Sequence, residues 1–572
     1  MKQYWKYVRP YLVFFIFGPL LMLSEVAGEI VLPKIMSGMI NVGIENGDVR
    51  YILTHALMMG LAILVMIIGG IGGHYLSIRA AISFSAALRK DVFKKVQKFS
   101  FKNIDRFSTG SLVTRLTNDI TQLEQTVRMS LIMLMRSPGL LVGGLIMALS
   151  INKELAKVLI VVIPILAGAI IFLMKKAFPR FGEMQTKIDN LNSATQENIT
   201  NVRVVKSFVR EKFEILKFKK SNDELADSTI RAMNIIIWNM PVMTLAMNIT
   251  TIAIVWKGGN FVIGGNMGLG DLSAFTTYIT QILMSLMMLS MIIIQGSRAA
   301  ASSKRIKAVL NEVIDLTDDD ANEKDKAVEN GSIEFKNVCF KYYENRKDNI
   351  LNNLSFKIDS GTTVGIVGTT GSGKSSLVQL IPRLYDANEG EVLVDGTNVK
   401  DYSLKNLRSG VAMVLQKNVL FSGTIRENLK WGDENATQEE IEEFASFAQA
   451  HQFVQNFEGG YDMELGQGGV NVSGGQKQRL CIARALLKKP KILILDDSTS
   501  AVDTATEAKI REAFHTTLKD TTKIIIAQRI SSVIQADKII VLDKGEIAGM
   551  GSHDELMLSC DEYRDIYNSQ NN

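Results

Sequence analysis

Cysteine is scarce in this chain, and its spacing fits neither a disulfide framework nor a metal site. Only 3 cysteines occur among 572 residues, and all of them lie in the C-terminal half, at Cys339, Cys481 and Cys560. Such usage argues for a reducing compartment and against a disulfide-stabilised secreted fold. We interpret the three as buried or inert thiols.

The chain also lacks a strong charge excess, and we expect neither a cleavable signal peptide nor an N-terminal peptidase domain. Its net charge is +5, and the basic residues gather in loops beside apolar runs without forming a nucleic-acid-binding stripe. We therefore expect no nucleic-acid partner. The first ten residues are basic and aromatic and lead into an apolar run far longer than a signal core.

What the chain does contain is a mixture of very apolar and well-charged sequence. Its residues are 47% hydrophobic and 22% charged, which indicates a membrane part joined to a soluble part. We expect a transmembrane all-α domain over residues 1–310, an acidic, solvated linker over 311–330 and an α/β domain over 331–572. Asp318, Asp319 and Asp320 lie at the centre of the linker.

About six apolar runs are long enough to cross the roughly 30 Å hydrocarbon core of a bilayer. They lie near residues 11–32, 52–74, 131–150, 157–175, 236–263 and 271–296. The short connections near 41–50, 151–156 and 264–270 carry few basic residues, whereas the long ones near 79–128 and 176–234 are rich in them. The N-terminus, the long connections and everything after Arg298 should therefore face the cytoplasm. The long connections are helix-compatible and should extend the helices beyond the lipid.

Two carboxylates interrupt the first apolar run, where a central charge costs about 2.5–3.5 kcal/mol. Glu25 and Glu29 are four residues apart and share one helix face. They could attract cations in a substrate cavity, or they could pair with a neighbour such as Arg136 or His74. Both interpretations stay open at this point.

Two residue types in the other apolar runs also invite a structural or a functional interpretation. The glycines at 69, 70, 72 and 73 favour close helix packing over ligand contact. Methionines at 284, 287, 288 and 291 could form an adaptable apolar surface, although ordinary packing explains them more simply.

The C-terminal half alternates short β-rich runs with helical stretches. The runs at 364–367, 411–415, 492–495, 524–526 and 539–542 predict a buried parallel sheet. After the first of them comes a complete phosphate-binding loop, formed by Gly368, Thr369, Thr370, Gly371, Ser372, Gly373, Lys374, Ser375 and Ser376. Its backbone N–H groups should surround phosphates, Lys374 should reach the outer phosphates, and Ser375 should ligate Mg²⁺.

Two further motifs follow, of which the first occurs in many nucleotide hydrolases and the second narrows the class. The run Lys491 to Asp496 is an apolar strand ending in the acid expected to hold Mg²⁺ through water. Just ahead of it stand Ser473, Gly474, Gly475 and Gln476. These four resemble the signature of ATP-binding cassette (ABC) ATPases, which closes on the γ-phosphate held by an opposite cassette.

The rest of the chain resembles an ABC exporter half-transporter. By that resemblance, Tyr342 would stack on adenine, Gln416 would sense Mg²⁺, and Ser500, Ala501, Val502 and Asp503 would form the loop that crosses the cassette interface. The tips of the long connections, 101–105 and 203–208, resemble coupling segments, together with Gly110, Arg115, Asp119, Lys206 and Glu211. The resemblance implies ATP and Mg²⁺ as cofactors, with Ser375, Gln416 and Asp496 at the metal. It also implies a bacterial cytoplasmic membrane location with a cytoplasmic nucleotide-binding domain.

Three positions depart from the family pattern. Asp497 stands where the carboxylate that polarises the attacking water is normally Glu, and Gln528 stands where His is usual. One methylene fewer withdraws the carboxylate by roughly 1 Å, and such a misplacement can cost about a hundredfold in rate. Gln528 can donate a hydrogen bond but cannot become cationic. Gln467 likewise replaces a usual Glu, which weakens an expected contact to a coupling segment.

The departures affect hydrolysis while the signature stays intact, a pattern that resembles the degenerate-site subunit of heterodimeric bacterial multidrug exporters. We expect this chain to pair with a second half-transporter in the lipid membrane and to export small amphipathic compounds. The alternatives are a slow homodimer that exports lipid or peptide, and an ATP-gated channel or regulator.

Overall fold

The structure is a computed structural model that describes residues 2–319, 321–342, 348–497 and 502–571. Two compact units divide the chain. The first contains residues 1–97 and 110–311, and the second contains 98–109 and 312–572. The segment 98–109, which tips the first long connection, therefore belongs to the second unit.

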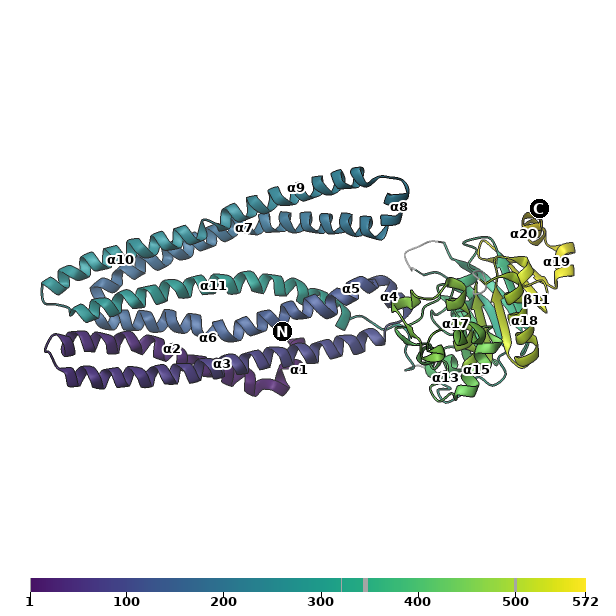
Figure 1. The fold of residues 1–572 in the computed structure, drawn as a ribbon, viewed down its shortest axis with the longest axis horizontal. Helices are drawn as coiled ribbons and strands as arrows, with labels where there is room; N and C mark the ends of the chain where they lie inside the picture. The colour runs from purple at the N-terminus through teal and green to yellow at the C-terminus, as the bar shows by residue number, and fades with distance from the viewer. Residues whose placement is uncertain (1, 320, 343–347, 498–501, 572) are drawn as a thin grey trace. The chain divides into compact units, whose positions relative to one another are not determined.

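The first unit is a set of long helices, drawn from purple to teal in Figure 1. Within the described residues, six helical segments are long and apolar enough to cross a membrane, as the sequence predicts. The helices of this part are α1 (Trp5–Val8), α2 (Leu12–Gly38), α3 (Val49–Gln97), α5 (Thr109–Thr114), α6 (Ile120–Ile151), α7 (Lys153–Thr200), α8 (Val202–Ser207), α9 (Glu211–Ile236), α10 (Asn239–Ile263) and α11 (Leu269–Leu310). Turns of 3₁₀ type at Lys2–Tyr4 and Arg9–Tyr11, and of π type at Met39–Ile44 and Arg115–Asp119, extend them.

The helices continue far beyond the apolar runs. α3 has 49 residues and α7 has 48, so at about 1.5 Å per residue each is more than twice as long as a bilayer core is thick. The long connections thus form helical extensions, as expected. α7 and α9 run side by side and are joined at their tip by the short helix α8 (Figure 1).

Glycine allows the first two spanning helices to pack closely. A Cβ atom at Gly69 would lie 1.8 Å from the Ser24 hydroxyl oxygen, and one at Gly73 would lie 2.6 Å from the Met22 sulfur. A Cβ atom at either position would also lie 3.0 Å from a backbone carbonyl oxygen of α2, so a larger residue would force a local shift between α2 and α3. The packing interpretation of this glycine cluster is confirmed.

The second unit contains a central six-stranded sheet with the order β12-β11-β3-β10-β9-β6. All five predicted strands are in it and run parallel, while β12 pairs antiparallel with β11. The strands are β3 (Thr363–Gly368), β6 (Val411–Val414), β9 (Ile492–Asp496), β10 (Thr522–Ile526), β11 (Lys538–Asp543) and β12 (Glu546–Gly551). A four-stranded sheet contains β1 (Ile333–Phe340), β2 (Leu351–Ile358), β4 (Glu389–Val394) and β5 (Thr397–Asn398), and β7 (Gly423–Thr424) pairs with β8 (Glu464–Leu465).

Helices surround these sheets and bury their apolar strands. They are α4 (Phe101–Phe107), α12 (Lys374–Leu380), α13 (Leu404–Gly410), α14 (Ile425–Leu429), α15 (Gln438–Phe447), α16 (His451–Gln455), α17 (Gly474–Leu487), α18 (Thr504–Thr517), α19 (His553–Ser559) and α20 (Asp561–Asn571). Short 3₁₀ turns occur at Gly460–Asp462, Gln467–Gly469 and Ile530–Ser532. Every residue of β9 and β10 is buried, which explains their uninterrupted apolar sequence.

The acidic segment 311–330 differs from a freely solvated linker. Asp318 accepts a hydrogen bond of 2.8 Å from the backbone N–H of Leu404, and Lys326 donates one of 2.6 Å to Thr397. Leu316 and Val328 are each only 6% exposed. Short apolar residues between the acids therefore attach this segment to the second unit, which a composition-based prediction does not detect.

Candidate nucleotide site

The loop between β3 and α12 has the tight form that phosphate binding needs. Gly368 has φ of 151°, and a Cβ atom there would lie 2.1 Å from the Leu542 carbonyl oxygen, so only glycine fits. The Lys374 ammonium donates hydrogen bonds of 2.8 Å to the carbonyl oxygens of Gly368 and Thr369. Burial lowers the pKa of Lys374, and the negative charges of Asp496 and Asp497 oppose that shift. The remaining predicted loop residues are Thr370, Gly371, Ser372, Gly373, Ser375 and Ser376.

Ser375 and Asp496, two of the residues expected at Mg²⁺, lie in direct contact. The hydroxyl of Ser375 donates to a carboxylate oxygen of Asp496 at 3.0 Å, and Asp496 ends β9 with only 3% exposure. Burial raises the pKa of Asp496, and the hydrogen bond from Ser375 opposes this. Among the described residues no cluster of three His, Cys, Asp or Glu side chains could hold a metal. One or two protein oxygens suit Mg²⁺, which keeps waters and takes phosphate oxygens as its other ligands.

The carboxylate of Asp497 is hydrogen-bonded by two glutamine side chains, those of Gln416 and Gln528. The Gln528 side-chain amide donates to a carboxylate oxygen of Asp497 at 2.7 Å, and Gln416 makes a further side-chain hydrogen bond to the same group. Burial raises the pKa of Asp497, while the hydrogen bond from Gln416 opposes that shift. The family-atypical pair therefore lies in direct contact, which residue spacing alone could not show.

The backbone of Asp497 is also fixed. Its φ of 49° lies in the left-handed region, which Asp tolerates better than most residues. Its N–H donates to the Ile526 carbonyl at 3.0 Å, and the Gln478 amide donates to its carbonyl at 3.4 Å. Gln478 lies on α17, so it connects the signature helix to this turn. The sequence does not predict this contact, because nothing distinguishes Gln478 from other glutamines in helices.

Tyr342 lies beside α12, the helix that follows the phosphate loop. Its hydroxyl is 2.9 Å from the Ser376 hydroxyl oxygen, and its ring packs edge-on against Tyr385 with centroids 5.1 Å apart. Ser376 itself is buried, with 6% exposure. Tyr342 therefore lies beside the phosphate loop, and its hydroxyl is hydrogen-bonded to the side chain of Ser376.

The signature occupies the exposed start of α17. Ser473 caps the helix: its hydroxyl accepts from the Gln476 N–H at 3.3 Å, and its own N–H donates to the Gln476 side chain at 2.9 Å. Gly474 is exposed, and Gly475 follows it in the first turn. Asp503 caps α18 by accepting from the Thr506 N–H at 3.0 Å. Ser500 and Ala501 lie outside the described residues.

The two acids of the first apolar run bind one arginine. Arg136 lies 2.9 Å from Glu25 and 2.6 Å from Glu29, measured between nitrogen and carboxylate oxygen. His74 instead contacts the Gly70 carbonyl at 2.9 Å. Pairing with Arg136 is confirmed, and two carboxyl groups share one guanidinium.

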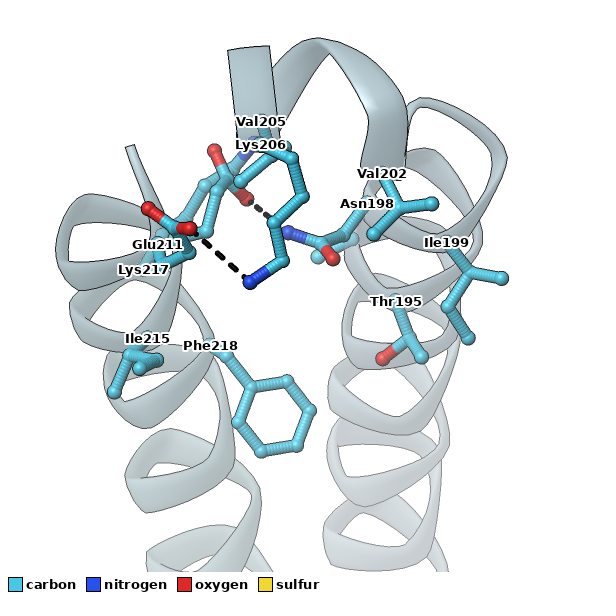
Figure 2. A pocket seen from close by; sticks show the side chains of 12 residues that line it. Thr195, Asn198, Ile199, Val202, Val205, Lys206, Glu211, Ile215, Lys217 and Phe218 are labelled. Atoms are coloured by element: carbon cyan, nitrogen blue, oxygen red, sulfur yellow. Dashed lines mark hydrogen bonds and ion pairs between the residues drawn. The ribbon is translucent and has the colours of Figure 1, made fainter. Parts of the chain in front are cut away.

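Both predicted coupling segments form short helices. In α4, Asp105 accepts a 2.9 Å hydrogen bond from the Tyr385 hydroxyl, which places this segment on the surface of the nucleotide-binding fold. In the other, α8 covers a cavity of about 420 Å³ between α7 and α9 (Figure 2). Lys206 and Glu211 form an ion pair of 3.1 Å at its rim. The first segment has a contact on the cassette of its own chain, through Tyr385.

Comparison with known proteins agrees with this geometry. Residues 15–286 match the family model described as ABC transporter transmembrane region, and residues 351–500 match the one described as ABC transporter. The chain is 39% identical over 573 residues to the uncharacterized ABC transporter ATP-binding protein YfiB of Bacillus subtilis, covering 100% of this chain and 98% of that protein. It is 34% identical over 580 residues to the putative multidrug export ATP-binding/permease protein YgaD of the same organism, covering 100% and 99%.

A solved structure supports the same conclusion. A bacterial Atm1-family ABC exporter with ATP bound superposes with a TM-score of 0.83 and 26% identity over 98% of each chain. Six apolar helices, a complete phosphate loop and an exposed signature are thus joined in one chain. This protein belongs to the ABC transporter family, as a multi-pass membrane half-transporter of exporter type whose ABC domain is a transport ATPase.

Proposed function

We propose that this chain is the degenerate-site half of a heterodimeric exporter for amphipathic compounds, located in a bacterial cytoplasmic membrane with its cassette in the cytoplasm. Its own pocket would chiefly hold ATP with Mg²⁺. Its signature would complete the hydrolytic pocket of a second half-transporter. The observation that carries this proposal is the contact between Asp497 and Gln528.

That contact supports slow hydrolysis for two physical reasons. The Asp497 carboxylate is shorter than Glu, and amide groups from Gln416 and Gln528 already bind it. A general base must lie within hydrogen-bond reach of the water it polarises, and neutral Gln528 cannot relay a proton. The nucleotide-holding groups Lys374, Ser375 and Asp496 remain complete, so binding does not suffer.

The signature supports a partner with a functional site. Ser473 retains its capping bonds, and the helix that it caps begins at exposed Gly474. An exposed helix start offers N–H groups and a partial positive charge to a phosphate. Since a signature acts on the opposite cassette, its preservation beside an altered carboxylate favours a partner that supplies Glu and His.

In this proposal each residue of the pocket has a distinct task. Tyr342 supports the adenine, Lys374 binds the outer phosphates, and Ser375 and Asp496 hold Mg²⁺ together with Gln416. Mg²⁺, when bound, would neutralise phosphate charge. ATP retained here would keep the cassettes together while turnover in the other pocket shifts the helices between inward-open and outward-open states.

Two observations bear on the substrate class. One relative, YgaD, carries the name putative multidrug export protein. Glu25 and Glu29 provide two acidic groups for one Arg136, which favours a cationic group on the compound. Uphill dye accumulation in inside-out vesicles tests export, because a channel can only dissipate a gradient.

The decisive experiment restores the longer carboxylate. Asp497→Glu should raise the ATPase activity of the purified complex by about tenfold, since the carboxylate regains its reach. Asp543→Glu, the same change at the end of β11, serves as the control. Unchanged activity in Asp497→Glu would refute the distance argument. Purification of a tagged chain that yields only copies of itself would refute the heterodimer.

A further inference from the structure

The C-terminal helix holds the backbone of the loop that carries Gln528. The side-chain amide of Gln570 donates to the Gln528 carbonyl at 2.7 Å, and its oxygen accepts from the Ile530 N–H at 2.8 Å. The Gln570 side chain therefore makes two hydrogen bonds to the backbone of residues 528–530, one as donor and one as acceptor.

The helix that carries Gln570 is firmly packed. Tyr563 is fully buried, and its hydroxyl lies 2.9 Å from a ring nitrogen of His553 in α19. Ile566 and Tyr567 pack against the main core of the cassette. Gln570 thus projects from a fixed base, near the last turn of α20.

The loop is held from other directions as well. Ile530 is only 2% exposed, and Arg511 of α18 donates to the Ser531 carbonyl at 2.6 Å. These contacts fix the part of the loop that follows residue 529. The Gln570 contact is the one that reaches the carbonyl of Gln528 itself, whose side chain binds Asp497 at 2.7 Å.

We propose that Gln570 is a positioning residue for the nucleotide site: it fixes the backbone of Gln528 and so aims the Gln528 amide at Asp497 and the outer phosphate. A bidentate contact constrains both position and rotation of the loop. Displacement of a positioned group by about 1 Å is enough to change a rate by up to a hundredfold. The C-terminal helix thereby controls how long nucleotide stays in this pocket, an inference that rests on the proposed retention of ATP.

Release of nucleotide from this chain provides the test. The complete assembly in native membranes is loaded with an azidoadenine-substituted ATP radiolabelled at its α-phosphate, chased with unlabelled ATP and illuminated at intervals. Label on this chain's own band then reports its pocket, because Tyr342 lies beside it. Gln570→Met keeps side-chain length and helix propensity but removes both hydrogen bonds. Gln570→Glu keeps the acceptor for Ile530 and loses the donor.

Gln570→Met should speed release by about tenfold, and Gln570→Glu by less. Gln528→Ala should also speed release, and the double variant should be no faster than Gln528→Ala alone, since Gln570 acts through that side chain. Exchange of the Ile530 amide hydrogen should rise in Gln570→Met. Ser569→Ala, which removes a bond to Ile566 within the same helix, should leave release unchanged.

Two results would overturn the proposal. One is a nucleotide release rate in Gln570→Met within twofold of the native rate. The other is a release rate in the double variant raised by the product of the two single effects. The first denies any influence on the pocket, and the second indicates general destabilisation. Failure of the proposed function is seen separately, in the native protein, as release at the rate of ATP turnover. The ratio between variant and native release can be measured in either case.

Discussion

The cassette carries two parts of a nucleotide site, the phosphate-loop half and the signature half. They differ in how many of their polar groups are bound by other residues of the same chain. In the half built on Lys374 and Asp497, the altered carboxylate is bound by Gln416 and Gln528. In the signature half, Ser473 caps α17 and leaves the start of that helix exposed. The first half carries Asp497 and Gln528, whereas the second keeps Ser473, Gly474, Gly475 and Gln476. The difference teaches that the two halves can vary independently, which our proposal explains by assigning them to different pockets.

The largest expected effect comes from breaking the signature half. Gly475→Asp places a negative charge where a phosphate of the opposite pocket should bind, and ATPase activity should fall by about a hundredfold or more. An acid in a first helical turn stabilises the helix by about 0.3–1 kcal/mol, so folding should survive. The neutral variant Gly475→Asn controls for size. Equal losses in both variants would show that bulk, and not charge, is responsible.

A smaller effect should appear in the half that holds nucleotide. The pKa of Asp496 is raised by burial, so protons compete with Mg²⁺ at higher pH than they would at an ordinary Asp. Below that raised pKa, Mg²⁺-dependent labelling of the pocket should weaken by about tenfold per pH unit, whereas it should be constant well above it. Asp496→Asn should remove this dependence. Labelling that persists unchanged down to about pH 4 would contradict the raised pKa.

The smallest effect concerns the fold of the signature alone. Ser473→Ala removes a helix cap and should cost about 1 kcal/mol of unfolding free energy, measured without nucleotide by denaturant titration. Thr437→Ala provides a matched comparison, because Thr437 caps α15 through the same reciprocal arrangement. We expect the two losses to agree. A much larger loss at Ser473 would mean that the signature has a structural task beyond its cap.

Much of the fold could be predicted because the relevant signals are local. Long apolar runs give spanning helices, and each of the five predicted strands lies in the parallel sheet. The phosphate loop could likewise be predicted from its glycine spacing. At Gly368 the backbone of Leu542 approaches so closely that no side chain fits. Periodicity and steric limits act over a few residues, so they survive in a single sequence.

Contacts between distant residues escaped prediction. Nothing in the letters shows that Gln570 binds the backbone of residues 528 and 530, or that Gln478 reaches the turn at Asp497. The ion pairs of Arg136 were one of several open options until the helices were packed. The acidic segment 311–330 is attached to the second unit. Its composition hides this, because charged residues outnumber the few apolar residues that make the contacts.

The sequence by itself determined the family, the six membrane helices, the phosphate loop and the identity of the altered residues Asp497 and Gln528. Those features depend on residue type and short spacing, which chain order preserves. Only the tertiary structure decided that Asp497 and Gln528 touch, that Glu25 and Glu29 share Arg136, and that the last helix holds the backbone of the loop that carries Gln528. Such contacts join residues tens to hundreds of positions apart, and their geometry is fixed only when the sheets and helices pack.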